Sequence, residues 1–222
     1  MKYQTYIENV KNDRMEEVIK SAAQLFMNNG IENIKMTDIA KDCEVGVASL
    51  YRYFKTKTAI LIRSAIYEWE RVNELFDGIF ECPTYAEKSG LEQIKELLKL
   101  QLVLFISHKN FLRFLYGFDV YMIKEKVDKS ELCEYEKSIL NIYPYFENAY
   151  KKGIDDKTVR TDIDFSLFCK SLSHSLMNLC QKFIIGEILP NDDFSNAEEE
   201  IKMMIDMAIS YLGKENEKGD TL

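Results

Sequence analysis

The hydrophobic positions of residues 36–57 form two short helical patterns with a tight break between them. Apolar residues recur at helical spacing over residues 36–43 and again over residues 47–54, and the break runs from Glu44 to Gly46. Two short helices joined by a three- or four-residue turn that contains glycine are the sequence form of a helix-turn-helix. In that motif the second helix lies in the major groove of DNA and the first helix crosses the DNA backbone.

The second of these helices is predicted to have a buried face and a DNA-facing side. Its apolar stripe consists of Val47, Leu50, Tyr51 and Phe54. The other side begins with the small residues Ala48 and Ser49, which let the backbone approach DNA, and ends with Arg52 and Tyr53. Arginine can read guanine bidentately or bind phosphate, and tyrosine hydroxyls bind phosphate. The alternative is a small amphipathic helix pair inside an α-helical core.

A long helix is expected to start directly after the motif. Thr56 is a good N-cap residue, which would place Lys57 at a helix N-terminus, where backbone N–H groups also favour a phosphate. The apolar spacing of this helix continues to about Phe80, and the later patterns predict further helices over 89–107, 111–126, 130–152, 164–186 and 195–212. Only three prolines and nine glycines interrupt the 222 residues, which favours long helices.

The predicted fold is therefore all-α, in two domains. Residues 1–60 would form an N-terminal three-helix DNA-binding domain with the helix-turn-helix at about 36–55. Residues 61–222 would form a C-terminal helical bundle for effector binding and dimerisation.

The run Leu50-Tyr51-Arg52-Tyr53-Phe54-Lys55-Thr56-Lys57 is more specific than a generic helix-turn-helix. It follows Thr37-Asp38-Ile39-Ala40 and Val45, and the segment Ala22-Ala23-Gln24-Leu25-Phe26 with Gly30 comes before both. In this arrangement residues 14–64 resemble the N-terminal domain of the TetR family of transcriptional regulators. The resemblance implies a homodimeric repressor that a small, largely apolar or aromatic effector releases from a palindromic operator in double-stranded DNA. The implied DNA-binding residues are Lys35, Thr37, Gly46, Val47, Ala48, Ser49, Tyr51, Arg52, Tyr53 and Lys57.

Three positions depart from the family pattern. Glu44 stands where the turn usually carries glycine, so a positive φ there would cost on the order of 1 kcal/mol, unless Gly46 shifts the turn geometry. Ala48 replaces a common glycine at the start of the recognition helix, and Lys35 replaces a capping Thr or Ser.

The second domain has more aromatic and methionine side chains than two bundle layers require. Pockets between bundle helices are the usual place for an apolar ligand, although core packing is the alternative for any one of these side chains. The candidate effector-pocket residues are Trp69, Phe105, Phe114, Phe118, Tyr121, Tyr143, Phe146 and Met177.

Broad apolar faces on the expected helices at 164–186 and 195–212 predict a two-fold dimer that buries them as a four-helix bundle. The candidate interface residues are Phe168, Leu172, Leu176, Ile201, Ile205 and Ile209.

The charge is divided unevenly along the chain. The net charge is −8, but residues 1–60 hold 9 Lys and Arg against 8 Asp and Glu, whereas residues 61–222 hold 20 against 29. The acidity therefore belongs to the second domain, and DNA binding needs only a basic face on the first. An alternative function is a small-molecule-binding or protein-interaction module whose helix-turn-helix no longer binds DNA, which Glu44 and the weak basic charge of residues 1–60 keep open.

An all-α enzyme is a second alternative, but the sequence offers no catalytic constellation. The two histidines, His108 and His174, have no carboxylate at a ligand spacing, and no nucleophile elbow or phosphate-binding glycine loop occurs. We therefore expect no catalytic residue, metal or cofactor. Five cysteines without C-x-x-C spacing, no signal peptide and no apolar run of 18 residues predict a reduced, cytoplasmic protein without a membrane segment. A redox-sensing cysteine remains open.

Overall fold

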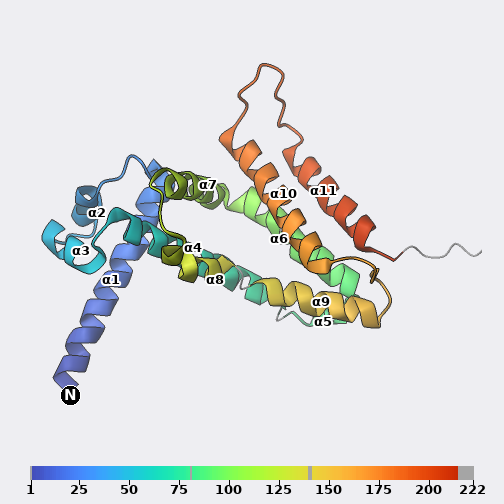
Figure 1. Cartoon of the computed structure of the whole chain (residues 1–222), viewed down its shortest axis with the longest axis horizontal. Coiled ribbons are helices and arrows are strands. Elements are labelled where there is room, and N and C mark those ends of the chain that lie inside the picture. Colours follow the sequence, from blue (N-terminus) through green and yellow to red (C-terminus); the bar gives the residue numbers. More distant parts are fainter. Residues whose placement is uncertain (1, 81, 140–141, 215–222) are drawn as a thin grey trace, which may run out of the picture. The chain divides into compact units, whose positions relative to one another are not determined.

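The computed structural model describes residues 2–80, 82–139 and 142–214, and nearly all of this part of the chain is helical (Figure 1). The described residues form no β-strand, apart from one isolated bridge between Val159 and Gly213. The helices are α1 Lys2–Asn29, α2 Met36–Asp42, α3 Val47–Phe54, α4 Lys57–Phe80, α5 Pro83–Glu87, α6 Gly90–Ser107, α7 Lys109–Lys124, the 3₁₀ turn η1 Lys129–Leu132, α8 Cys133–Ile139, α9 Tyr143–Asp155, α10 Phe165–Ile185 and α11 Ala197–Leu212. The all-α prediction is confirmed.

The predicted boundaries hold best where a capping residue marks a helix start. Helix α4 begins at Lys57, and the Thr56 hydroxyl accepts a hydrogen bond from the Ala59 N–H at 3.1 Å. Ser89 and Asp164 likewise accept N–H bonds at the starts of α6 and α10. These side chains satisfy N–H groups that have no partner within the helix.

Two boundary predictions are wrong. A single helix over 130–152 does not form, since η1, α8 and α9 replace it, and Pro144 lies in the first turn of α9, where its missing N–H costs nothing. The helix predicted to begin at residue 111 begins two residues earlier, since α7 starts at Lys109. The short helix α5 lies where only a break was expected.

The chain divides into two compact units. The first unit comprises residues 1–74 and 113–141, and the second comprises residues 75–112 and 142–222. Helices α4 and α7 each contribute residues to both units. The sequence predicts a division after residue 60. The compact units instead place residues 57–74 of α4 and most of α7 together with the helix-turn-helix.

The first unit is built around α1. Its core contains Val18, Ala22 and Phe26 of α1, with Leu50 of α3 and Ile60 of α4, each at most 1% exposed. A second layer of aromatic side chains from α4, α7 and α8 surrounds Tyr135, whose hydroxyl accepts from Trp69 Nε1 at 3.4 Å. Helix α2 packs against both α1 and α3, and α2 and α3 lie on one side of α1 (Figure 1).

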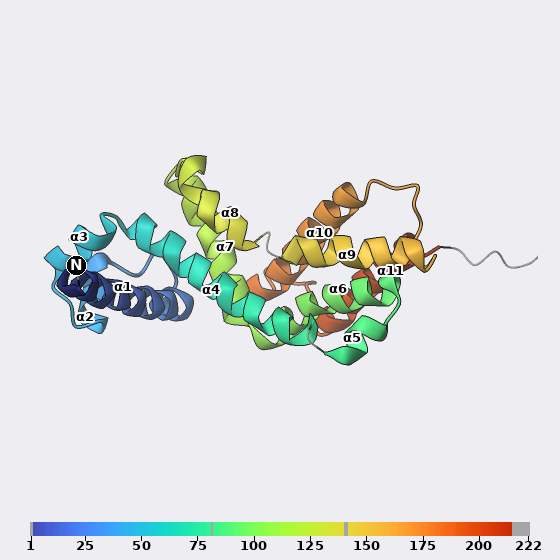
Figure 2. The same cartoon turned by 90° about the horizontal axis from the view of Figure 1, so that it is seen from below.

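The second unit packs α6 against α9 and α11 (Figure 2). Gly90 at the start of α6 faces Gly153 of α9 so closely that a Cβ on Gly90 would lie 2.0 Å from the Gly153 nitrogen. The loop after α9 closes the joint, because Asp156 Oδ2 accepts from the Gly90 N–H at 2.8 Å and Thr158 Oγ1 accepts from the Leu91 N–H at 3.2 Å. Helices α10 and α11 run side by side, joined by residues 186–196 (Figure 1).

Candidate DNA-binding surface

Helix α3 buries two side chains, Leu50 and Phe54, in the core of the first unit. Val47 is 38% exposed and Tyr51 is 49% exposed, so the prediction that both belong to the buried stripe is wrong. An eight-residue helix that rests on two anchors leaves most of its circumference in solvent.

The exposed side of α3 combines small, apolar and charged groups. Val47 and Ala48 lie one turn ahead of Tyr51 and Arg52, and all four are exposed. Residues four apart lie on the same side of a helix, so these side chains form one continuous surface. We call this surface, Val47, Ala48, Tyr51 and Arg52, the α3 face.

The turn between α2 and α3 is a Schellman motif with an unfavourable residue at its centre. The Val45 N–H donates to the Ala40 carbonyl at 2.9 Å and the Glu44 N–H donates to the Lys41 carbonyl at 3.3 Å. Glu44 adopts φ 52°, the left-handed conformation for which glycine is preferred. Gly46 has φ −66° and does not share this strain. The predicted cost at Glu44 is therefore present.

Polar side chains of α1 hold this turn in place. An Arg14 nitrogen donates to the Cys43 carbonyl at 3.0 Å, and the Ser21 hydroxyl donates to the Asp42 carboxylate at 2.5 Å. Arg14 is not among the predicted residues, and no local sequence pattern marks it, because its partner lies 29 residues away.

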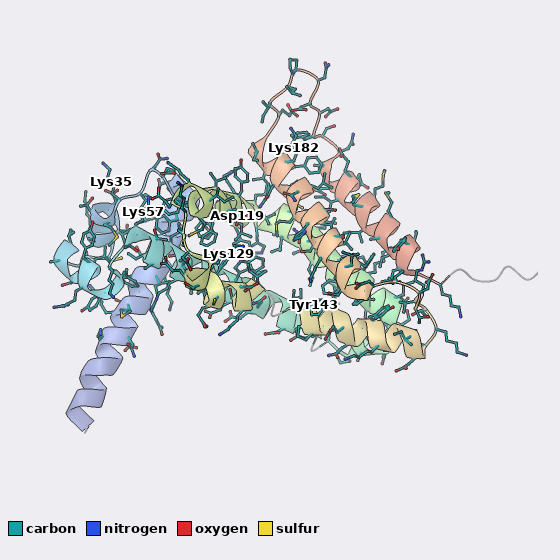
Figure 3. All side chains as sticks on the ribbon, viewed as in Figure 1. Lys35, Lys57, Asp119, Lys129, Tyr143 and Lys182 are labelled. Carbon is teal, nitrogen blue, oxygen red and sulfur yellow. The ribbon has the colours of Figure 1, made fainter. Side chains whose placement is uncertain are left out.

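The start of α2 lacks the hydroxyl cap of the family pattern. Lys35 occupies the N-cap, and its backbone N–H donates to Asp38 Oδ2 at 2.8 Å. Half of a capping box therefore remains, with Asp38 serving as its carboxylate. Lys35 is exposed (Figure 3), and Thr37, two residues later, is exposed as well.

A strained tight turn joins α3 to α4. Lys55 has φ 62° and ψ −51°, and the Thr56 N–H donates to the Phe54 carbonyl at 2.7 Å. This is the geometry of a γ-turn of the rare, strained kind. The Lys55 side chain is exposed, so the turn presents a cation immediately before the N-terminus of α4.

Tyr53 lies between two cations at the edge of the α3 face. The Lys11 ammonium is 5.9 Å from the centre of its ring and the Arg52 guanidinium carbon is 5.2 Å from it. An Arg52 nitrogen also donates to the Tyr53 hydroxyl at 3.4 Å. The ring is half-buried, and Ser49 is half-buried as well.

Lys57 differs from the other predicted contacts because its ammonium is directed inside the first unit (Figure 3). Lys57 Nζ donates to the Ile31 carbonyl at 2.5 Å and lies 5.4 Å from the centre of the Tyr121 ring. Burial lowers the pKa of this ammonium from its usual value. This geometry argues against the phosphate contact that the sequence predicts for the Lys57 side chain.

Comparison with known proteins places this surface in a family. Residues 18–63 match the family model for bacterial regulatory proteins of the tetR family. The chain is 25% identical over 171 residues to an uncharacterised HTH-type transcriptional regulator of Bacillus subtilis, YerO, and the match covers 76% of this chain and 56% of YerO. Residues 18–63 of this chain are therefore of the TetR type. The chain spans about half the length of the curated relatives it matches, with 44% covered in a second Bacillus subtilis regulator, YuxN.

Solved structures extend the likeness of fold beyond the matched segment. A TetR transcription regulator from Haloarcula marismortui superposes with a TM-score of 0.70 at 16% identity, covering 91% of this chain and all of that one. The transcriptional regulator FadR from Bacillus subtilis, in complex with stearoyl-CoA, superposes with a TM-score of 0.62 at 14% identity, covering 89% and 98%. TetR-family proteins are DNA-binding transcriptional regulators, often repressors, rather than enzymes.

The eight candidate effector-pocket residues are divided between the two units. Trp69, Phe114, Phe118 and Tyr121 are buried in the first unit, and Phe105 is buried in the second. Tyr143, Phe146 and Met177 are half-buried in the second unit. The first four pack around Tyr135 and Lys57 as core.

Two grooves lie on the surface of the described residues, and none of the eight candidates lines either one. One groove, of about 730 Å³, lies between α1, α4 and α8 of the first unit. The other, of about 620 Å³, lies between α10 and α11. Its walls include Leu167, Ser171, Met207 and Tyr211.

The predicted dimer residues of α10 and α11 lie mostly in the core of the second unit. Leu172, Leu176, Ile201 and Ile205 are buried within the chain itself, while Phe168 and Ile209 are half-buried. A different stripe of α11 faces solvent: Met203 is 62% exposed, Met207 59% and Tyr211 53%. These three residues recur at a spacing of four, so the sequence also contains this second stripe, whereas the prediction places the isoleucine stripe at the interface.

Within the described part of the chain, no helix is both long and apolar enough to cross a membrane. His108 follows the last residue of α6, and His174 lies within α10. The described His, Cys, Asp and Glu side chains form no group of three that could hold a metal ion.

Proposed function

We propose that this protein is a homodimeric, ligand-responsive DNA-binding transcriptional regulator that acts as a repressor at a palindromic operator. The observation that carries the proposal is the α3 face, in which small residues at the start of the helix are followed by Tyr51 and Arg52, all in solvent. Small side chains permit close approach to the major groove, and Arg52 can read a guanine edge.

The neighbouring groups suit a phosphate backbone. Lys35 and Lys55 are exposed cations on either side of the motif, and the N-terminus of α4 presents backbone N–H groups. Tyr53 is proposed as a phosphate contact through its hydroxyl, which already accepts from Arg52. Thr37, Gly46 and Ser49 complete the proposed DNA-contacting set, with Lys57 contributing its backbone N–H rather than its ammonium.

A dimer supports this function because each recognition helix reads only half of a palindrome, and two-fold symmetric sites lie roughly 34 Å apart. The proposed interface is the exposed stripe Met203, Met207 and Tyr211 of α11 with the adjoining groove against α10. Self-complementary contact of this kind, a methionine ridge against a groove, is what a two-fold axis requires.

The effector is proposed to be small and largely apolar or aromatic. The ligand in the FadR structure, stearoyl-CoA, has a long apolar chain, and it belongs to that protein. A ligand can release DNA only if it binds one conformation better than the other. A coupling of about 2–3 kcal/mol would weaken operator binding about 30- to 150-fold, and operator DNA would weaken effector binding by the same factor.

The test begins with selection of bound duplexes from a random library, so that no operator has to be assumed. Anisotropy titrations then compare the selected duplex with a random one for wild type, Arg52→Ala and Lys129→Ala. Arg52→Ala should weaken the selected duplex by about 5- to 150-fold and the random duplex far less, because a bidentate base contact is worth about 1–3 kcal/mol.

Lys129→Ala is the matched control, since Lys129 is an exposed cation on η1, away from the motif (Figure 3). Equal weakening of both duplexes by Arg52→Ala would make Arg52 a phosphate contact. Failure of the wild type to enrich any duplex would favour the alternative, a binding module whose helix-turn-helix no longer reads DNA.

A further inference from the structure

Three elements of the first unit meet at the Lys57 side chain. These are the N-terminus of α4, which carries Lys57, the segment 30–35 between α1 and α2, and α7, which carries Tyr121. We call the segment 30–35 the connector. It leads directly into α2, so its position decides where the helix-turn-helix starts.

The contacts of Lys57 are those of a half-buried internal tie. Its ammonium donates to the Ile31 carbonyl at 2.5 Å, and Ile31 is 5% exposed. The same carbonyl accepts a long bond of 3.4 Å from the Ile34 N–H, so Lys57 provides its shorter contact. The face of Tyr121, 5.4 Å away, offers the ammonium a cation–π interaction, which strengthens when the cation is desolvated.

Helix α7 holds the same connector at two further points. Lys124 Nζ lies 2.7 Å from Glu32 Oε1, the residue after Ile31. A Cβ on Gly117 would lie 3.4 Å from Ile31 Cδ1, so the glycine lets α7 approach the Ile31 side chain. The hydrogen bond and charge of Lys124 hold the pKa of Glu32 below its usual value, with a smaller contribution from Lys57.

We propose that Lys57 is a positioning residue, which ties the connector to α4 and α7 through the Ile31 carbonyl and the Tyr121 ring and thereby sets the orientation of the helix-turn-helix. The proposal rests on the proposed DNA-binding function. An ammonium that reached for a phosphate would have to leave both partners. Lys55, two residues earlier, is exposed and free of this conflict.

The salt dependence of DNA binding separates a positioning residue from a phosphate ligand. Removal of a phosphate contact lowers the slope of log K against log salt by about 0.9, whereas removal of an internal tie lowers affinity and leaves the slope unchanged. Lys57→Met should weaken the selected duplex about tenfold at an unchanged slope, about the value of one charge-assisted hydrogen bond. Lys55→Met, the matched charge removal, should lower the slope.

A double-mutant cycle with Tyr121 tests the route of the effect. Tyr121→Phe keeps the ring and should bind DNA within about twofold of wild type, whereas Tyr121→Leu removes the ring and should weaken binding. Lys57→Met should then cost clearly less in the Tyr121→Leu background than in wild type, since coupled residues are not additive. Three results would each overturn the proposal. Lys57→Met could lower the salt slope, it could leave the affinity for the selected duplex unchanged, or its effect could be fully additive with that of Tyr121→Leu.

A measurement without DNA distinguishes failure of the tie from failure of the proposed function. Hydrogen exchange of the amides from Ile34 to Val45 should become faster in Lys57→Met and in Tyr121→Leu, and should change little in Lys55→Met. If the wild type binds no duplex but exchange still accelerates, the DNA-binding function is wrong and the tie stands. If exchange is unchanged in folded Lys57→Met, the tie is wrong. If Lys57→Met does not fold, Lys124→Met provides a milder variant, because it removes only the exposed ion pair between α7 and Glu32 of the connector.

Discussion

Helices α3 and α11 both place large side chains in solvent, and the chemistry between those side chains differs. On α3 the exposed Val47 and Tyr51 alternate with Ala48 and Arg52, so apolar and cationic groups share one face. On α11 the exposed Met203, Met207 and Tyr211 recur every four residues and form a largely apolar stripe without a charge. A mixed cationic face suits a polyanion with base edges, whereas an apolar stripe suits another protein surface.

The two helices also differ in how they are anchored. Helix α3 rests on Leu50 and Phe54, and polar ties from α1 and α4 hold the turns beside it. Helix α11 buries Ile201, Ile205 and Leu212 in the second unit, where α6 and α9 meet at a glycine contact. Directional ties suit a motif that must present one precise geometry. Close packing suits a core that must support an interface.

The glycine contact should give one of the two largest effects of the changes considered for the second unit. In Gly90→Ala the new Cβ would lie 2.0 Å from the Gly153 nitrogen and 2.5 Å from the Ala149 carbonyl oxygen, so the backbone of α9 would have to move. We expect unfolding free energy to fall by about 3 kcal/mol or more, measured by urea denaturation.

Gly78→Ala is the control for this change. Gly78 lies in α4, within the second unit, and a Cβ there meets no atom of the described side chains within 4 Å. Because alanine has a higher helix propensity than glycine, Gly78→Ala should raise the unfolding free energy by about 1 kcal/mol. A Gly90→Ala protein as stable as wild type would mean that α6 and α9 do not cross this closely.

The second prediction separates the two faces of α11. Ile205→Glu places a carboxylate at a site that is 2% exposed and should unfold the second unit, because an unpaired buried charge costs several kcal/mol. Met207→Glu, two residues away and 59% exposed, should leave the fold intact and convert a dimer to a monomer by sedimentation. If Met207→Glu stays dimeric at low micromolar concentration, the dimer forms through another surface.

How far the sequence predicts this molecule depends on the range of each interaction. Caps at Thr56, Ser89 and Asp164 were readable because they act within four residues, and the motif run located α2, α3 and α4. The contact of Gly90 with Gly153 and the direction of the Lys57 ammonium were not readable, since both depend on partners far along the chain.

The assignment of apolar faces failed for a related reason. Both α3 and α11 carry apolar residues around more than one stripe, and periodicity alone does not say which stripe packs inside the same chain. For α3 the helix is too short to bury Val47 and Tyr51 as well as its two anchors. For α11 the isoleucine stripe faces α6 and α10, which leaves the methionine stripe in solvent.

The smallest predicted effect concerns the turn that sets α3 relative to α2. Glu44 has φ 52° at the position of a Schellman motif that favours glycine, and its side chain is exposed. Glu44→Gly relieves about 1–2 kcal/mol of backbone strain and loses part of this to the greater entropy of an unfolded glycine. We expect a net gain of about 0.5–1 kcal/mol in unfolding free energy, with the Val45 to Ala40 bond retained. Glu44→Ala is the matched control, because it removes the same charge and keeps the strain, and it should give no gain. Equal stabilisation by both substitutions would mean that repulsion by the carboxylate, rather than the left-handed backbone, is what destabilises the turn.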